Sequence, residues 1–230
     1  MESQERTTLK MINKTFTEIF DGNTERYLLL TEITPEGKKK TTQPHGSFPV
    51  DLHLDPKQPN KIFGRSPVKY TNEGKGLCRW IGLDVDLKLE PEEACKKAWS
   101  VDTDIIPFRS TNGKWHYYKF LKDFIDVDRA RLIKDKLVEQ FNILGLKCDK
   151  DKCLPQGYNL KDKTPGNQLY LPRFYDGTIP YSPRGEPLTE SQFLFRLDNL
   201  KHPLISGSVG LVSGTGDTGG RQKVLFTIAL

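Results

Sequence analysis

Residues Leu77–Leu87, LCRWIGLDVDL, are the stretch of this chain that says most about its fold. The run is apolar around the two acids Asp84 and Asp86, which predicts a β-strand with a buried side. Side chains alternate across a strand, so Leu83 and Val85 face one side of the predicted sheet and both carboxylates face the other. The strand therefore presents an acid pair on one face and a hydrophobic core on the other.

The acid pair is suited to a divalent metal ion. Two residues along a strand separate the Cα atoms by roughly 6.6 Å, so the carboxylates can converge on one cation or on two that lie about 3.5–4 Å apart. Without a cation, two like charges on one face repel each other. Mg²⁺ and Mn²⁺ prefer such oxygen ligands. We therefore expect Asp84 and Asp86 to bind metal; the alternative is a solvent-exposed strand face.

The spacing of the pair is not informative by itself, because Asp-x-Asp occurs four times in the chain. The other copies lie in a predicted loop, at a predicted helix start and in a polar turn: Asp102 and Asp104, Asp126 and Asp128, and Asp149 and Asp151. Acids at a helix start cap backbone amides and complement the helix dipole, so that copy has a structural explanation. Only the pair at 84 and 86 interrupts an apolar strand.

Helical and strand patterns alternate on both sides of this strand. Ile105–Arg109 and Trp115–Leu121 are predicted to form a hairpin with Asn-Gly at its turn. Apolar spacing and end signals predict helices over 8–20, 91–99, 128–144 and 189–200, strands over 27–33 and 168–174, and a short extended piece over 48–54. This order predicts an α+β fold with mixed or antiparallel sheets and packed helices.

The stretch Arg109–Lys122 combines four basic residues with Trp115, Tyr117, Tyr118 and Phe120 and contains no acid. Basic and aromatic side chains together suit the phosphates and bases of nucleic acids. The alternative is an ordinary strand with a solvent-exposed lysine face. The sequence leaves both interpretations open.

Composition excludes several classes of protein. The chain has 230 residues, of which 36% are hydrophobic and 28% charged, and its formal net charge is +5. No apolar run approaches the roughly 20 residues that span a bilayer, and the N-terminus lacks the apolar stretch of a signal peptide. We therefore expect a cytoplasmic protein without a membrane partner. The four cysteines lack the spacing of a disulfide framework or a zinc site, so we expect no structural zinc.

Four segments occur in the order WIGLDVD, RSTNGKWHYYKF, CDKDKCLPQGYNL and GNQLYLPRFYDG. In this order they resemble the archaeo-eukaryotic primase superfamily, and within it the primase-polymerases of phages, mobile elements and CRISPR-associated systems. The resemblance implies a primase core whose catalytic sheet is like that of the RNA-recognition fold. It also implies DNA-template-dependent joining of nucleoside triphosphates by two-metal nucleotidyl transfer in DNA replication.

The resemblance assigns roles to residues of these segments. Asp84 and Asp86 match the strand-borne acid pair of the family, and Asp151 matches its third acid, for which Asp149 is the competitor. These carboxylates would bind two Mg²⁺ or Mn²⁺ ions. His116 matches the histidine of the second motif and would act with them in catalysis. The residues that would contact the nucleotide are Ser110, Thr111, Lys114, His116, Asn167 and Arg173.

The same resemblance implies a domain organisation and partners. The catalytic domain would span 1–203, with an N-terminal subregion over about 1–76 and a metal-binding core over about 77–203. A glycine-rich linker is expected over 204–219, and 220–230 would begin a helical domain that continues further, toward a helicase. The expected partners are a single-stranded DNA template and ribo- or deoxyribonucleoside triphosphates, in the host cytoplasm if a phage encodes the chain.

The sequence also leaves two other classes of function open. A non-catalytic single-stranded nucleic-acid-binding module would bind template without metal and would expose aromatic side chains on its open sheet face. Another metal-dependent phosphoryl or glycosyl transferase would use Asp-x-Asp to hold a nucleotide sugar or a phosphodiester. That enzyme would bind metal but would not incorporate nucleotides on a template.

Overall fold

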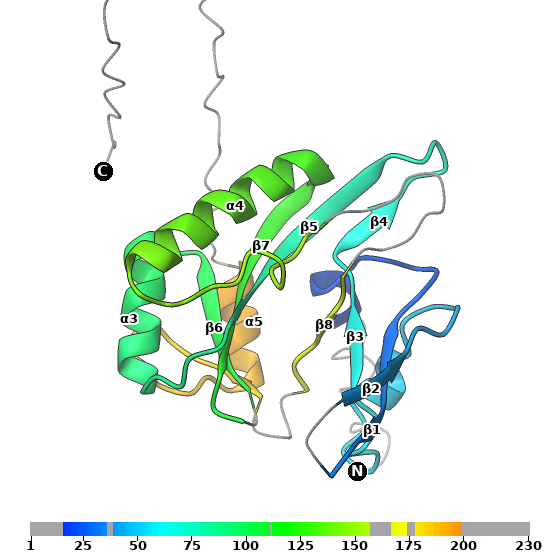
Figure 1. Ribbon diagram of the computed structural model, residues 1–230, viewed down its shortest axis with the longest axis horizontal. Coiled ribbons are helices and arrows are strands. Elements are labelled where there is room, and N and C mark those ends of the chain that lie inside the picture. Colours follow the sequence, from blue (N-terminus) through cyan, green and yellow to red (C-terminus); the bar gives the residue numbers. More distant parts are fainter. Residues whose placement is uncertain (1–15, 36–38, 111, 157–166, 174–177, 199–230) are drawn as a thin grey trace, which may run out of the picture.

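The computed structural model describes residues 16–35, 39–110, 112–156, 167–173 and 178–198. The strands are β1 (Leu28–Ile33), β2 (Lys39–Thr42), β3 (Phe63–Arg65), β4 (Val68–Tyr70), β5 (Gly76–Val85), β6 (Ile105–Arg109), β7 (Trp115–Asp126), β8 (Leu169–Tyr170) and β9 (Ile179–Pro180). The helices are α2 (Val50–His53), α3 (Pro91–Val101), α4 (Val127–Ile143) and α5 (Glu190–Asp198). The described chain thus combines two antiparallel sheets with packed helices, which confirms the expected α+β class (Figure 1).

The two sheets draw on strands from distant parts of the sequence. The larger sheet has the order β4-β5-β7-β6-β9, and the smaller sheet has the order β2-β1-β3-β8. β8 therefore joins the smaller sheet from the C-terminal part of the chain, beside strands from its N-terminal part. The linker expected over 204–219 and the helical start expected over 220–230 lie outside the described residues.

The strand expected over 77–87 is β5, between β4 and β7 of the larger sheet. It pairs with β7 in antiparallel register, with Asp84 opposite His116. β6 and β7 form the predicted hairpin, which is closed by Arg109 opposite Trp115. β7 is longer than expected, because its second half pairs with the start of β5.

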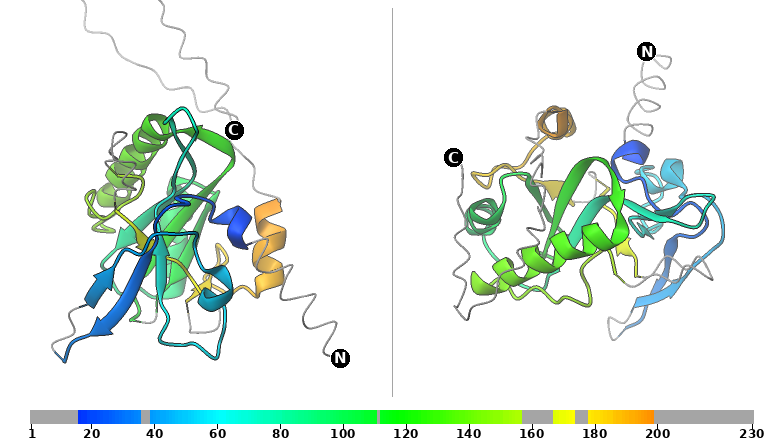
Figure 2. Two further views of the ribbon diagram at one scale, coloured as in Figure 1. Left: turned by 90° about the vertical axis from the view of Figure 1, so that its right-hand side faces the viewer. Right: turned by 90° about the horizontal axis from the view of Figure 1, so that it is seen from above.

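Helices α3 and α4 lie on one face of the larger sheet and α5 lies on the other (Figure 2). α4 is the helix expected over 128–144. The Asp126 side chain caps it by accepting a hydrogen bond from the backbone N–H of Asp128, and Gly145 follows with a φ of 75° that glycine adopts at low cost. α3 starts at Pro91 with acids in its first turn, as predicted.

Each face of the larger sheet has its own hydrophobic core. Under α3 and α4, the core contains Leu83 and Val85 of β5 together with Phe141 of α4. On the other face, aromatic side chains dominate: Phe16, Phe20, Phe48, Phe63, Trp80, Phe108, Tyr118, Phe120 and Phe193. Residues 16–19 are helical, which confirms the end of the helix predicted over 8–20, whereas 8–15 lie outside the described residues.

Two expected elements are different in the structure. The piece over 48–54, expected to be extended, contains the helix α2, because the amides of His53 and Leu54 donate to the carbonyls of Pro49 and Val50. The strand expected over 168–174 pairs only over β8. Pro172 follows shortly after β8 and has no N–H with which to extend the ladder. α5 falls within the range predicted for its helix.

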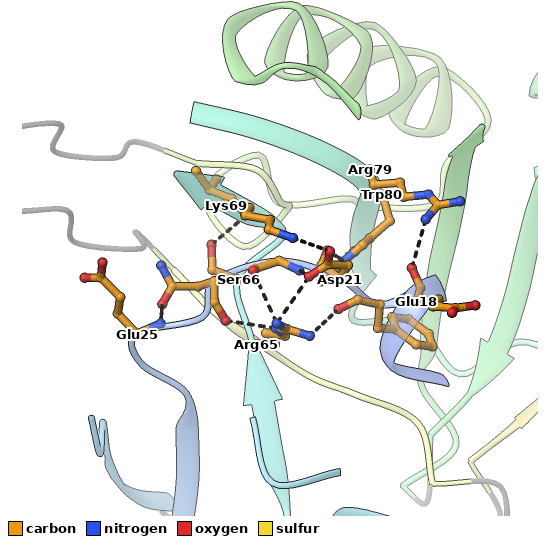
Figure 3. A network of polar contacts seen from close by, with 12 residues as sticks. Glu18, Asp21, Glu25, Arg65, Ser66, Lys69, Arg79 and Trp80 are labelled. Atoms are coloured by element: carbon orange, nitrogen blue, oxygen red, sulfur yellow. Dashed lines mark hydrogen bonds and ion pairs between the residues drawn. The ribbon is translucent and has the colours of Figure 1, made fainter. Parts of the chain in front are cut away.

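A network of polar contacts around Arg65 of β3 fastens the chain before β1 to both sheets (Figure 3). The Arg65 guanidinium donates to three backbone carbonyls, those of Phe20 at 3.0 Å, Gly22 at 3.3 Å and Asn23 at 3.0 Å. It also pairs with the Asp21 carboxylate at 3.4 Å, and Lys69 of β4 contacts the same carboxylate at 2.7 Å. The indole of Trp80 donates to the Asp21 carbonyl at 2.9 Å.

Within the described residues, no helix combines the length and the apolar character needed to span a bilayer.

Candidate functional site

A cavity of about 630 Å³ lies where the end of β5 and the start of β7 meet the smaller sheet. Its polar lining includes Asp84, Asp86, Ser110, Asn112, Lys114, His116, Asp151, Lys152, Asn167, Gln168 and Arg173. Its apolar lining comes from Leu28, Leu30, Ile33, Ile62, Leu169 and Leu171. A cavity of this size falls in the range that holds small organic ligands.

Asp84 and His116 face each other where β5 and β7 reach the cavity. Directly opposed residues of an antiparallel pair share one face of the sheet, and His116 Nε2 lies 3.4 Å from Asp84 Oδ1. Leu83 and Val85, on either side of Asp84, are buried in the core under α3 and α4. The prediction that Leu83 and Val85 face a core and that Asp84 points to the opposite side is therefore confirmed.

Asp86 follows the last residue of β5 and lies between two lysines. Lys114 Nζ donates to Asp86 Oδ1 at 2.7 Å, and Lys152 Nζ donates to Asp86 Oδ2 at 2.5 Å. The hydrogen bonds from Lys114 and Lys152 lower the pKa of Asp86 from 3.8 to about 2, because they stabilise the charged carboxylate. In return, Asp86 raises the pKa of Lys152. Asp86 is therefore ionised near neutral pH.

The segment 148–154 is held against β5. Two isolated bridges connect them, Gly82 with Leu154 and Val85 with Cys148. The buried thiols of Cys148 and Cys153 lie 3.2 Å apart in this segment. The hydrogen bond to Cys153, together with burial, raises the pKa of Cys148. These contacts fix the backbone that carries the third expected carboxylate.

Asp151 lies in this segment and lines the cavity, whereas Asp149 is not among the residues that line it. The amide of Asp151 donates to Asp149 Oδ1 at 2.9 Å, which tightens the turn. Asn167 Nδ2 donates to the Asp151 carbonyl at 3.1 Å. This bond ties the acidic turn to the residues that lead into β8.

The hairpin turn between β6 and β7 brings Lys114 to Asp86. Ser110 Oγ donates to the Lys114 carbonyl at 2.9 Å, and Gly113 has a φ of 80° that favours glycine. Ser110 lines the cavity, and Thr111 lies outside the described residues.

Arg173 also lines the cavity, although its side chain is committed in part to the protein. Only 5% of it is exposed, and its Nη1 donates to the Pro59 carbonyl at 2.6 Å. Arg173 therefore supports the wall of the cavity and leaves less of its guanidinium for a ligand.

The carboxylates provide suitable donor atoms for a divalent metal but do not converge in this arrangement. Asp84, Asp86 and Asp151 all line the cavity and offer oxygen ligands. Within the described ranges, no three carboxylate, imidazole or thiol groups stand close enough together to hold an ion. Asp86 is engaged by its two lysines. The donor atoms are of the type that Mg²⁺ and Mn²⁺ prefer, and an ion at Asp86 would have to displace its two lysine partners.

The sequence left two interpretations open for the stretch 109–122, a basic-aromatic surface and a strand with a solvent-exposed lysine face. Trp115, Tyr117, Tyr118 and Phe120 are all buried in the two cores. Lys119 is 4% exposed, and its Nζ pairs with the carboxylates of Asp102 and Asp104, at 2.7 and 3.7 Å. The aromatic residues therefore form no open face, and of the two lysines of β7 only Lys122 is exposed. The pattern of residue types does not reveal which side chains are buried.

The structure also adds residues that sequence reasoning did not assign. Lys152 completes the ionic cluster on Asp86, and the alternation of Asp and Lys over 149–152 was the available signal for it. Gln168 and Tyr170 line the cavity from β8 and its approach. Nothing in their spacing marks them, because their place depends on the pairing of β8 with β3.

Eight of the nine residues predicted for the site line this one cavity, and the ninth, Thr111, lies outside the described residues. The eight come from segments that are far apart in the sequence, around 84–86, 110–116, 151 and 167–173. No protein-family model and no curated protein matches this chain.

Proposed function

We propose that this chain is the catalytic core of a primase-polymerase, a metal-dependent nucleotidyltransferase that copies a single-stranded DNA template during DNA replication. One observation carries the proposal. Residues predicted from four separate motifs line a single cavity, in which carboxylates and lysines lie side by side. Carboxylates hold divalent cations and lysines hold phosphates, and nucleotidyl transfer needs both.

The proposal assigns metal binding to the carboxylates of the cavity and phosphate binding to its lysines. Asp84, Asp86 and Asp151 would hold Mg²⁺ or Mn²⁺, and the bound metal would supply activation of the attacking 3′-hydroxyl and neutralisation of the triphosphate. Lys114 and Lys152 give charge-assisted hydrogen bonds to phosphate oxygens once they leave Asp86.

His116 belongs at the same end of the cavity. Its Nε2 lies 3.4 Å from Asp84 Oδ1, so the carboxylate orients the ring. From this position the imidazole donates a hydrogen bond to a phosphate oxygen near the acid pair. The template, a downstream helicase and a cytoplasmic location belong to the same proposal.

The variant Asp84→Asn tests this function directly. Purified chain is incubated with labelled nucleotides, Mg²⁺ or Mn²⁺, and single-stranded DNA with and without a primer. We expect template-dependent incorporation by the unmodified chain and a loss of at least about 100-fold in Asp84→Asn, because the amide cannot replace a metal-binding carboxylate. The matched control is Asp123→Asn, an exposed residue of β7 that does not line the cavity.

Template affinity is measured in parallel, and Asp84→Asn is expected to retain it. Normal extension by Asp84→Asn would remove the assigned role of the acid pair. Metal-dependent nucleotide binding without any incorporation on a template would favour the other metal-dependent transferase instead. A non-catalytic nucleic-acid-binding module is disfavoured by the buried aromatic residues of β7, because such a module exposes its aromatics on the open sheet face.

A further inference from the structure

The cavity has two chemically different ends. One end carries the ionic cluster of Asp86 with Lys114 and Lys152. The smaller sheet and its neighbours contribute the other end, which is mainly apolar, with Lys39 among the side chains of Leu28, Leu30, Ile33, Ile62, Leu169 and Leu171. A ligand that fills both ends needs an anionic part and a flat or apolar part.

Two polar side chains at this boundary are unsatisfied. The amide nitrogen and oxygen of Gln168 and the hydroxyl of Tyr170 are shielded from solvent and have no hydrogen-bond partner among the described residues. An unpaired buried polar group costs about 1–3 kcal/mol, and folded proteins retain few of them. Both side chains line the cavity.

The backbone that carries these groups is held firmly. Tyr170 pairs with Gly64 of β3, and its carbonyl accepts a hydrogen bond from Tyr118 at 3.4 Å. Lys39 Nζ lies 4.9 Å from the centroid of the Tyr170 ring, a cation–π contact that restrains the ring. Buried polar groups without a partner call for an explanation, and a ligand in the cavity that both side chains line would supply one.

We propose that Gln168 and Tyr170 recognise the nucleoside part of a nucleoside triphosphate, whose phosphates bind at Lys114 and Lys152. Both side chains are half-buried, so a change of rotamer turns their polar ends toward a ligand in the cavity. A glutamine amide offers a donor and an acceptor together, which matches the polar edge of a base or a sugar hydroxyl. The apolar end receives the remaining surface of the nucleoside.

The inference rests on the proposed function only for the identity of the anionic group as a triphosphate. The link between the two ends is visible in the structure. Asn167, the residue before Gln168, donates to the carbonyl of Asp151 at 3.1 Å, so the nucleoside-recognising residues and the acidic turn are joined by a hydrogen bond.

The test measures binding rather than catalysis. Gln168→Leu and Tyr170→Phe are titrated calorimetrically, without template, with each ribo- and deoxyribonucleoside triphosphate and with inorganic tripolyphosphate. Gln140→Leu on the exposed side of α4 is the matched control, because it makes the same change outside the cavity. We expect Gln168→Leu to weaken nucleoside triphosphate binding by about tenfold and to leave tripolyphosphate binding unchanged.

The pattern among ligands identifies the contact. A loss that varies with the base and is equal for ribose and deoxyribose indicates the base edge, and a loss confined to ribonucleotides indicates the sugar hydroxyl. The melting temperature of the free Gln168→Leu protein is expected to stay equal or to rise, because the substitution removes an unpaired buried amide. A residue with a purely structural role would lower it.

Two results would overturn the inference: unchanged nucleoside triphosphate affinity in both variants, or an equal loss for tripolyphosphate. Different results would contradict the polymerase proposal and the nucleoside-recognition proposal. If the unmodified chain binds nucleoside triphosphates but incorporates none on a template, the polymerase proposal fails and nucleoside recognition stands. If it incorporates nucleotides but both variants bind them normally, only the present inference fails.

Discussion

The two lysines on Asp86 make metal binding and triphosphate binding depend on each other. Lys114 and Lys152 occupy both oxygens of this carboxylate, so an ion that binds Asp86 competes with two ammonium groups. Phosphate oxygens attract the same ammonium groups and thereby release the carboxylate. We expect each ligand to increase the affinity for the other, as linkage requires. Replacing the lysines by methionine, Lys152→Met alone or with Lys114→Met, removes the competition.

The size of the effect follows from the pKa of Asp86. Its fall from 3.8 to about 2 corresponds to about 2.5 kcal/mol at most. Because the Asp86 side chain is 40% exposed, solvent screening reduces this to about 1 kcal/mol for the two lysines together. Without nucleotide, we therefore expect Mn²⁺ affinity to rise about twofold in Lys152→Met and about fivefold in the double variant. Tripolyphosphate affinity should fall in both.

Mn²⁺ binding is measured by electron paramagnetic resonance, with and without tripolyphosphate. Lys136→Met, on the exposed side of α4, controls for the change in net charge. Unchanged or weaker Mn²⁺ binding in the double variant would refute the competition. A carboxyl titration followed by NMR gives a second readout. Asp86 contributes stability above pH 3.8 that is lost as the pH falls through about 2, and Lys152→Met should shift that loss toward higher pH.

Three predictions concern stability and are checked by chemical denaturation. Gly22→Ala should cost more than about 3 kcal/mol, because its Cβ would lie 2.1 Å from a backbone oxygen. Gly145→Ala, with open space around it, should cost only about 1 kcal/mol for its positive φ. Equal losses in the two variants would contradict the predicted clash. Phe141→Ala in the core should cost about 3–5 kcal/mol, and Leu132→Ala, 65% exposed, less than about 1 kcal/mol. Lys119→Met should cost about 3 kcal/mol, because it removes the cation that contacts two largely buried carboxylates; a neutral result would contradict a stabilising role for this ion pair.

Local patterns were sufficient for the elements with a strong signal of their own. β5 and α4 were predictable because their apolar periods are long and their end signals are clear. α2 was not. Over 48–54, Phe48, Val50, Leu52 and Leu54 alternate with other residues, which imitates a strand, although local backbone hydrogen bonds close a helix there.

In the candidate site, too, some residues could be predicted from local patterns and others could not. The acid pair at Asp84 and Asp86 could be found because an apolar strand surrounds it, and the resemblance then added His116 and Asp151. The ionic bond from Lys152 to Asp86 joins residues 66 positions apart, which no local period encodes. Likewise, the burial of the β7 aromatics depends on two cores that only the assembled sheets create.

The pairing of β8 with β3 also has a consequence for the order of events during synthesis. Gly64 pairs with Tyr170, so the smaller sheet is incomplete until the C-terminal part of the chain has left the ribosome, and chains emerge from the N-terminus at about 5–20 residues per second. Asp86 and Lys114 can meet earlier, at the β5–β7 pair, and Lys152 joins them once the segment 148–154 has emerged. Lys152 emerges before Tyr170, so a nascent chain acquires its ionic cluster first and its enclosed cavity about 1–4 seconds later at that rate, and such long-range closure is the slow kind of folding step.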